Sequence, residues 1–261
     1  MRIACWQAQA RVCDVAAALD GLHVRAREAA AAGARMMVTP EMSLSGYHVG
    51  RRRLRELAEP ENGPMADSVG RIAAECGIAI VYGWPEADGD RVYNSVRIVG
   101  ADGTGLATYR KTHLFGDIDR SSFAAGEIGV VQADVDGVTI GLVICYDVEF
   151  PELVRAHALR GTELLVVPTA LMAPWSFVAE TLVPARAFES QLFIAYTNWT
   201  GRERELEYCG LTKVVGPDGR TVAALDAGTA DGLLVADLRL PLIAEARAET
   251  AYLADRRPEL Y

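Results

Sequence analysis

Short apolar runs alternate along the chain with longer stretches of helical character. The runs typical of buried strands cover residues 3–8, 36–39, 78–84, 138–144, 163–168, 192–198 and 232–238. The stretches typical of helices cover residues 15–32, 65–76, 151–160 and 177–190, and a glycine follows each of the first two. Two further pairs of strand-like segments, 91–99 with 105–114 and 212–215 with 221–225, enclose turn sequences and indicate antiparallel hairpins.

Helices interleaved with strands indicate that helices cover a sheet, and the hairpins add antiparallel strands to it. The sequence therefore predicts an α/β fold with mixed sheets. No linker, low-complexity tract or charge block divides the chain, so residues 1–261 are expected to form a single domain. The order strand, helix, strand, hairpin occurs in the first half and again from Cys145 onward, which indicates two packed sheets of related build.

The segment GLVICYDVEFPE, residues 141–152, places a cysteine where a buried strand ends. Pro151 and Glu152 then suit the first turn of a helix, since proline lacks a donor and an acid favours the helix dipole. Cys145 is therefore expected in a strand-to-helix elbow, where helix amides and cations lower a thiol pKa and favour the nucleophilic thiolate. The alternative for a single cysteine is a buried, inert side chain.

Composition narrows the classes of function. The chain has 261 residues with a formal net charge of −9, which disfavours a nucleic-acid partner. No apolar run approaches the roughly 18 residues that span a bilayer, and no signal-peptide core follows Met1, so we expect a cytoplasmic protein without membrane segments. The five cysteines are widely spread and contain no CxxC pair, so neither a disulfide framework nor a zinc site is indicated.

Glu41, Lys111 and Cys145 each follow or end a predicted strand. Where strand ends meet at one edge of a sheet, such side chains converge on one cleft. A thiol, a carboxylate and an ammonium together supply the nucleophile, the proton shuttle and the oxyanion-stabilising cation of amide chemistry. Taken singly, Glu41 is compatible with a loop acid and Lys111 with an exposed hairpin charge.

Four segments of the chain carry a resemblance to a known family. TPEMSLSGY, YRKTHLFG, VICYDVEFPE and PARAFESQLFIAYTNWTG resemble, in order, segments of the nitrilase superfamily of carbon-nitrogen hydrolases. The resemblance implies a four-layer αββα sandwich with Glu41 as general base, Lys111 as catalytic lysine and Cys145 as nucleophile. It also implies a homodimer or larger assembly, with residues 241–261 forming a C-terminal tail that contacts a partner subunit. Arg186, Glu189 and Asn198 match positions with scaffold roles.

The chain departs from the commonest family pattern in two places. The family often carries a further glutamate after the lysine, and here Asp119 stands eight positions beyond Lys111, with Asp117 and Glu127 as rival candidates. Many members have arginine where this chain has Glu149. We interpret Glu149 as a marker of a branch near the small aliphatic amidases, and not as a catalytic residue.

The implied activity is hydrolysis of a small linear amide to a carboxylic acid and ammonia through a cysteine thioester, without a metal or organic cofactor. The backbone amide of Tyr146 would join Lys111 in holding the oxyanion, and Tyr47 and Trp175, with Phe177, would line an apolar substrate pocket, although core packing is an equally good reading of these aromatics. A nitrilase or an N-carbamoyl hydrolase would use the same triad. Outside enzymes, the alternative is a ligand-binding relative, which loss of a triad residue would have indicated.

Overall fold

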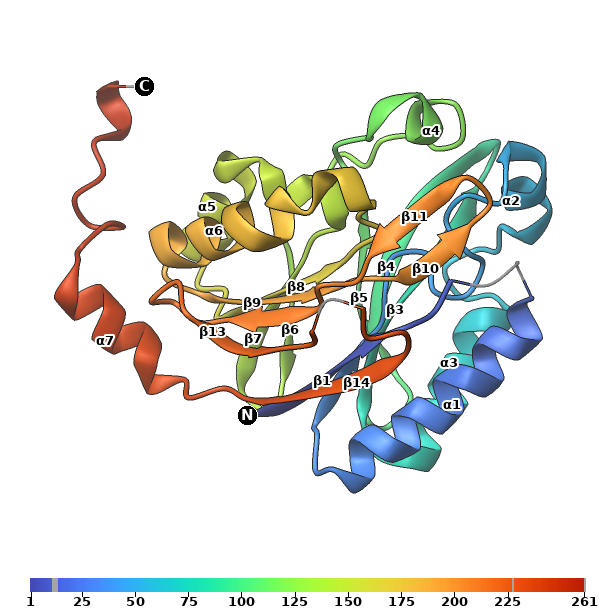
Figure 1. Ribbon diagram of the computed structural model, residues 1–261, viewed down its shortest axis with the longest axis horizontal. Coiled ribbons are helices and arrows are strands. Elements are labelled where there is room, and N and C mark those ends of the chain that lie inside the picture. Colours follow the sequence, from blue (N-terminus) through green and yellow to red (C-terminus); the bar gives the residue numbers. More distant parts are fainter. Residues whose placement is uncertain (11–13, 227, 261) are drawn as a thin grey trace.

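Two six-stranded sheets lie face to face in the computed structural model, which describes residues 1–10, 14–226 and 228–260 (Figure 1). The first sheet has the order β14(Gly232–Asp237), β1(Arg2–Gln7), β2(Met36–Val38), β3(Ala79–Asp88), β4(Arg91–Val99), β5(Gly105–Arg110). The second has the order β13(Thr221–Ala224), β12(Lys213–Val215), β9(Phe193–Thr197), β8(Leu164–Pro168), β7(Val138–Leu142), β6(Val131–Val135). A separate hairpin pairs β10(Thr200–Glu203) with β11(Leu206–Cys209).

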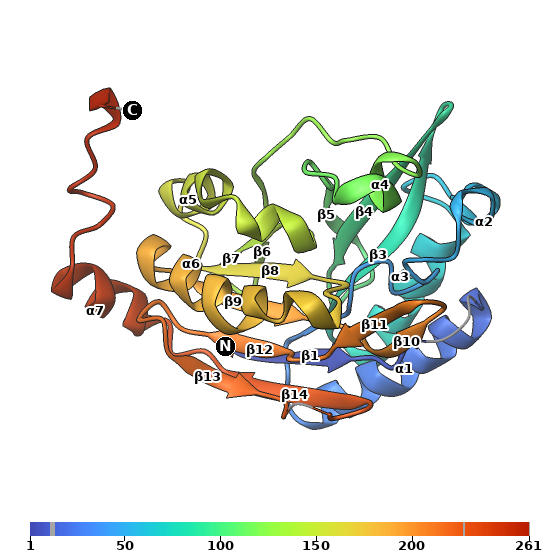
Figure 2. The ribbon, with the colours of Figure 1, turned by 45° about the horizontal axis from the view of Figure 1, so that its top comes forward.

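Helices cover the outer face of each sheet. The long helices α1(Val15–Ala31) and α3(Pro64–Cys76) pack on the first sheet, and α5(Pro151–Leu159) and α6(Val183–Ser190) cover the second (Figures 1 and 2). The layers therefore run helix, sheet, sheet, helix, which confirms the predicted αββα sandwich. Both sheets are mixed: β1, β2 and β3 are parallel neighbours, as are β7, β8 and β9, while the outer strands of each sheet pair antiparallel.

Side-chain alternation along the strands explains why both faces are apolar. In β2, Met36 and Val38 belong to the core that includes the space between the sheets, whereas Met37 packs in the core beneath α1 and α3. Successive strand residues point to opposite faces, so a strand covered on both sides must be apolar throughout. Burying a side chain of this size stabilises the fold by about 1.5–3 kcal/mol.

The helix boundaries follow their local signals. Asp14 caps α1 by accepting a hydrogen bond from the Ala17 amide at 3.1 Å. The left-handed Gly77, with φ of 64°, ends α3. Pro151 occupies the first turn of α5, as predicted.

Several short elements were absent from the prediction. These are α2(Arg51–Leu57), α4(Gly116–Arg120), β6, β10, β11 and α7(Pro241–Glu249), together with 3₁₀ turns at η1(Cys145–Glu149), η2(Ala173–Trp175) and η4(Pro258–Leu260). The predicted strand over 138–144 ends at Leu142, and that over 105–114 ends at Arg110, because the chain leaves the sheets before Cys145 and Lys111. The predicted helix over 177–190 begins as a π turn, η3(Val178–Leu182).

The C-terminal segment is anchored at its start and extended at its end. Ile243 of α7 is buried against the core, and the Gln191 side-chain amide donates to the carbonyls of Ala246 and Thr250 at 2.9 and 2.6 Å. Residues beyond α7 project away from the body in both views (Figures 1 and 2). Near the start of this segment, the Tyr252 ring packs edge-on against Phe188 of α6. The predicted tail therefore divides into a packed helix and a projecting end, of which residue 261 lies outside the described residues. No helix in the described chain is long and apolar enough to cross a membrane.

Candidate active site

Cys145 lies in a strained elbow after β7. It opens the 3₁₀ turn η1 with a φ of 47°, a left-handed conformation that costs a residue with a Cβ on the order of 1–3 kcal/mol. The helix α5 starts at Pro151, immediately after this turn and Phe150. The predicted strand-to-helix elbow is confirmed, and its strain requires nearby contacts that hold the turn in place.

Asp147 supplies those contacts. Its fully buried carboxylate accepts the Ile144 amide and the Tyr109 hydroxyl on Oδ2, at 3.1 and 2.9 Å. Its Oδ1 accepts the Thr112 hydroxyl and the His113 amide, both at 2.9 Å. Asp147 therefore ties the Cys145 turn to the segment that follows Lys111. Sequence analysis did not assign it a role, although an acid two residues after the nucleophile was the available signal.

Glu41, Lys111 and Asp119 form one buried ionic cluster. The Lys111 ammonium donates to Glu41 Oε1 at 2.8 Å and to Asp119 Oδ2 at 2.7 Å, and none of the three side chains is exposed to solvent. Glu41 comes from the turn after β2, Lys111 from the end of β5 and Asp119 from α4. The structure thus brings together Glu41 and Lys111, which were predicted at separate strand ends, and adds Asp119 to them.

Two further residues hold Glu41. The Asn94 side-chain amide donates to Oε1 at 2.6 Å, and the Trp199 indole N–H donates to the Glu41 backbone carbonyl at 2.8 Å. The second carboxylate oxygen, Oε2, is buried and has no hydrogen-bond partner among the described residues. One oxygen of Glu41 is therefore fixed while the other remains able to accept a proton. Sequence analysis did not identify Asn94 or Trp199, because no local pattern marks a partner that arrives from another strand.

A glycine allows the turn that carries Glu41 to approach β3. A Cβ atom on Gly83 would lie 2.5 Å from the backbone nitrogen of Met42, which directly follows Glu41. Any larger residue at this position would push the Glu41 turn outward. Gly83 therefore contributes to the position of the carboxylate through close backbone packing.

The expected lowering of the Cys145 thiol pKa is wrong, because burial outweighs the nearby cation and raises it, whereas Lys111 stays charged. Burial raises the pKa of the Cys145 thiol, and the Glu41 charge raises it further, while Lys111, a hydrogen bond with Thr169 and the Ala170 amide oppose the shift. Burial opposes charge on Lys111, but Asp119 and Glu41 outweigh it and hold the lysine pKa well above its ordinary value. Burial also raises the pKa of Glu41, partly offset by Lys111. A thiol with a raised pKa needs a base before it can attack, and Glu41 is the carboxylate whose charge acts on Cys145.

Asp119 is the acid that reaches the cluster. Besides Lys111, its Oδ2 accepts the Phe115 amide at 2.9 Å and its Oδ1 accepts the Tyr47 hydroxyl at 2.8 Å. Asp117 and Glu127, the rival candidates, are both exposed. Tyr47, predicted to bind substrate, is itself buried, and its ring centroid lies 5.7 Å from the Lys111 ammonium.

Aromatic side chains gather beside Cys145 and the segment after Lys111. The Phe115 ring meets Tyr146 and Trp175 edge-on, with centroids 5.4 and 6.3 Å away. Trp175 is 53% exposed and Phe177 is 59% exposed, so neither belongs to the core. Phe115, which sequence analysis did not mention, links the two predicted substrate-binding residues Tyr146 and Trp175 into one aromatic group.

Asn198 and Arg186, two of the predicted scaffold residues, form hydrogen bonds with backbone groups of neighbouring segments. The buried Asn198 accepts the Leu171 amide at 2.8 Å and donates to the Gly210 carbonyl at 2.7 Å. Arg186 donates to the carbonyls of Val148 and Glu149 at 3.3 and 2.8 Å. Its remaining nitrogen pairs with Glu189 at 3.0 Å, so Arg186 and Glu189 support the end of the Cys145 turn from α6.

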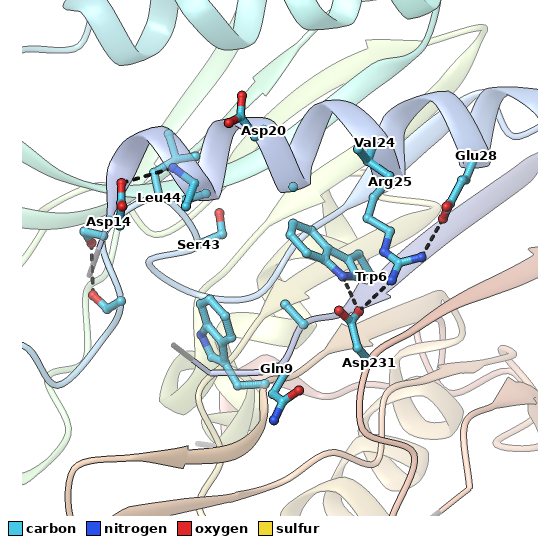
Figure 3. Close-up of a pocket in the computed structure, with 17 residues that line it drawn as sticks. Trp6, Gln9, Asp14, Asp20, Val24, Arg25, Glu28, Ser43, Leu44 and Asp231 are labelled. Atoms are coloured by element: carbon cyan, nitrogen blue, oxygen red, sulfur yellow. Dashed lines mark hydrogen bonds and ion pairs between the residues drawn. The ribbon is translucent and has the colours of Figure 1, made fainter. Parts of the chain in front are cut away.

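A separate hollow of about 470 Å³ lies behind the Glu41 turn, between α1 and residues 43–46 (Figure 3). Trp6 lies inside it, and Asp231 accepts from the Trp6 indole at 2.8 Å while also pairing with Arg25. Trp199 lies in its wall, but Glu41, Lys111 and Cys145 do not line it. This hollow is therefore not the site of the reactive side chains. Within the described chain, no cluster of three or more histidine, cysteine or acidic residues is arranged to hold a metal ion.

Comparison with known proteins identifies the family. The profile of a family described as carbon-nitrogen hydrolase matches residues 2–248. The chain belongs to the carbon-nitrogen hydrolases of the nitrilase superfamily. This carbon-nitrogen hydrolase therefore carries Cys145, Glu41 and Lys111 as its active-site residues, within a branch that acts on carbon–nitrogen bonds other than peptide bonds.

Relatives of this carbon-nitrogen hydrolase include amidases. It is 47% identical over 262 residues to a Pseudomonas protegens protein named hydrolase in pqqF 5′ region, covering 100% of this chain and 90% of that protein. It is 37% identical over 223 residues to an (R)-stereoselective amidase of a Pseudomonas species, covering 85% and 79%. A crystal structure of an amidase from a Nesterenkonia species has a TM-score of 0.86 at 35% identity, covering 100% and 94%.

Other structures of the Nesterenkonia amidase contain a small amide or a group derived from one. In a glutamate-to-glutamine variant, the acetamide moiety of fluoroacetamide is covalently bound to the active-site cysteine. In a cysteine-to-alanine variant, the enzyme is in complex with butyramide. Those observations belong to that enzyme.

Proposed function

We propose that this enzyme hydrolyses a small linear amide to the carboxylic acid and ammonia through a thioester on Cys145. The observation that carries the proposal is the buried Glu41 Oε2, which has no hydrogen-bond partner among the described residues, while Oε1 is held by Lys111 and Asn94. This arrangement separates the proton-accepting oxygen from the oxygen that fixes the side chain.

In the first half-reaction, Glu41 Oε2 takes the proton of Cys145 as the sulfur attacks the amide carbon. Lys111 and the backbone amide of Tyr146 hold the developing oxyanion. The carbon–nitrogen bond then breaks, and Glu41 returns the proton to the departing nitrogen, which leaves as ammonia. The thioester and neutral ammonia account for every atom of thiol and amide.

In the second half-reaction, Glu41 takes a proton from water as the water oxygen attacks the thioester carbon. The carbon–sulfur bond breaks, the sulfur regains a proton, and the carboxylic acid leaves. Asp119 acts in both halves by fixing the Lys111 ammonium, with Tyr47 and the Phe115 amide fixing Asp119 in turn. The aromatic group of Phe115, Tyr146 and Trp175 would line the entry for the acyl chain.

A nitrilase or an N-carbamoyl hydrolase would use the same three residues, and relatives named as amidases favour the amide. The test is a panel of aliphatic amides, ω-amides of dicarboxylic acids, N-carbamoyl compounds and nitriles, with ammonia release as the readout. We expect the highest kcat/KM on an aliphatic amide. Release of ammonia from nitriles alone would assign the enzyme as a nitrilase and not as an amidase. No release from any compound would favour a ligand-binding relative.

We also propose that the enzyme is a homodimer or larger assembly and that it is cytoplasmic. A homodimer or larger assembly is supported by the projecting end of the chain after α7, where Tyr252 and Leu260 are exposed. A cytoplasmic location is supported by the four described cysteines, all of which are free.

A further inference from the structure

Glu149 closes the 3₁₀ turn that Cys145 opens, and its carboxylate has no assigned partner. The side chain is half-buried, and neither oxygen takes part in a hydrogen bond or ion pair with any described residue. Arg186, a neighbouring cation, uses its three side-chain nitrogens on the Val148 carbonyl, the Glu149 carbonyl and the Glu189 carboxylate. The oxygens of the Glu149 carboxylate are not sealed from solvent, so a ligand that reaches the turn can also reach them.

The Glu149 side chain lies close to the active site, because it ends the turn that Cys145 begins. Burial raises the pKa of the Glu149 carboxyl, and the charges of Arg186 and Lys111 lower it. Glu149 and Cys145 are the two ends of one 3₁₀ turn, and a rise of about 2 Å per residue separates positions four apart by roughly 8 Å along its axis. Glu149 is therefore within electrostatic reach of a substrate held between Lys111 and Cys145.

The formal charges around the site sum to a negative value. Glu41, Asp119 and Glu149 carry negative charge. Lys111 is positive and is already paired with Glu41 and Asp119. Asp147 adds a further carboxylate, which accepts hydrogen bonds from Thr112, His113, Tyr109 and Ile144. A substrate that carries its own carboxylate would enter a field of like charge, and a protonated amine would enter one of opposite charge.

We propose that Glu149 selects substrates by charge: it binds an ammonium group on the acyl chain of a small amide and repels acyl chains that end in a carboxylate. This inference rests on the proposed amidase function and names its substrate class. Glu149 acts on specificity and takes no part in the chemistry at Cys145, because the proton and oxyanion roles belong to other groups.

The experiment compares kcat/KM for three amides of matched length: pentanamide, 5-aminopentanamide and the monoamide of glutaric acid. We expect kcat/KM to be highest for 5-aminopentanamide, lower for pentanamide and lowest for the monoamide of glutaric acid. Each step should be roughly fivefold to tenfold at low ionic strength and smaller in salt, as for a partly exposed ion pair. Glu149→Gln should compress the three values toward one another while pentanamide changes less than about threefold. Glu149→Lys should reverse the order of the charged pair.

Glu152→Gln is the matched control, because Glu152 is an exposed acid three residues further along the same chain segment. It should leave the charge preference unchanged. Titration of the three amides into Cys145→Ala protein, with and without Glu149→Gln, reads the same preference without turnover. A charge series that Glu149→Gln leaves unaltered, in an enzyme that hydrolyses pentanamide, would overturn this inference and leave the amidase proposal standing. Wild type inactive on all three amides would overturn the amidase proposal, and the binding series would then still decide the role of Glu149.

Discussion

The Lys111 ammonium lies 2.7 Å from Asp119 Oδ2, and both side chains are sealed from solvent. Eight residues separate them along the chain, and the helix α4 returns the carboxylate to the lysine. Two opposite charges buried together depend on each other, because removal of either leaves an uncompensated charge in the interior. Asp119 therefore fixes the position of the cation that also contacts Glu41.

Asp119→Asn should lower turnover of an amide by roughly tenfold or more, which corresponds to about 1.4 kcal/mol of activation free energy. The amide keeps the shape of the side chain but weakens its hold on the Lys111 ammonium. The rate of Cys145 alkylation by iodoacetamide should fall much less, since a positioning residue acts on substrate geometry. Asp117→Asn is the control and should be nearly silent, because Asp117 is exposed. The reverse order of the two variants would move the positioning role to Asp117.

Cys145→Ala should abolish ammonia release and leave the fold intact. The side chain is small, and its turn is held by Asp147 and not by the sulfur. Circular dichroism and the thermal midpoint should match wild type within a few degrees, since alanine at a left-handed position costs no more than cysteine does there. Residual turnover above a hundredth of wild type would contradict the nucleophile assignment.

Glu41→Gln should slow formation of the acyl-enzyme by roughly 10²–10⁴-fold, because the base is lost while its shape remains. Mass spectrometry of rapidly quenched reactions with an amide measures this step. Adducts with strong electrophiles are a separate reaction, as the cysteine of the Nesterenkonia variant with glutamine in place of a glutamate still carries such a group. Rapid acylation by the amide in Glu41→Gln would assign the base to another residue.

The same substitution should stabilise the protein above neutral pH. Burial raises the pKa of Glu41 in the folded state, so the folded protein holds this proton more tightly than the unfolded chain. Its contribution to stability is complete below the unfolded pKa, near 4.5, and is lost as pH rises through the higher folded pKa. The thermal midpoint of Glu41→Gln should exceed that of wild type at pH 8, and the difference should shrink as pH falls toward 5. A wild type that is more stable at pH 8 would contradict the direction of the shift.

His157 should make the fold sensitive to acid. It is buried in α5 with Nδ1 3.0 Å from the Thr162 hydroxyl, and burial lowers its pKa from 6.5 to about 4. Its contribution to stability is present above pH 6.5 and is lost as pH falls through about 4, a change of roughly 3 kcal/mol. Urea unfolding of His157→Gln should show a smaller loss of stability between pH 6.5 and 4 than wild type. The control His23→Gln replaces a partly exposed histidine and should keep the wild-type slope.

Amino-acid pattern alone indicated two packed mixed sheets covered by helices, and the family resemblance gave the four-layer sandwich. Apolar runs such as residues 36–39 and 138–144 must be buried on both faces. Polar and charged residues can follow such a run only where the strand leaves the sheet. Glu41 and Cys145 stand at such ends but in different sheets, so one site can hold both only because the two sheets pack face to face. The family resemblance of the surrounding segments gave their roles.

Only the tertiary structure decided which side chains hold the catalytic ones. Asn94 is 53 residues from Glu41 and Trp199 is 158 residues away, and each meets it through a hydrogen bond that no local pattern predicts. The position eight residues past Lys111 favoured Asp119 with Asp117 as a rival, and the orientation of α4 buries Asp119 and exposes Asp117. Local sequence sets which residues are apolar and where the chain turns, but the partner of a buried polar group depends on how distant loops fold back over the sheet edge, because its hydrogen bonds must be satisfied by whatever chain arrives there.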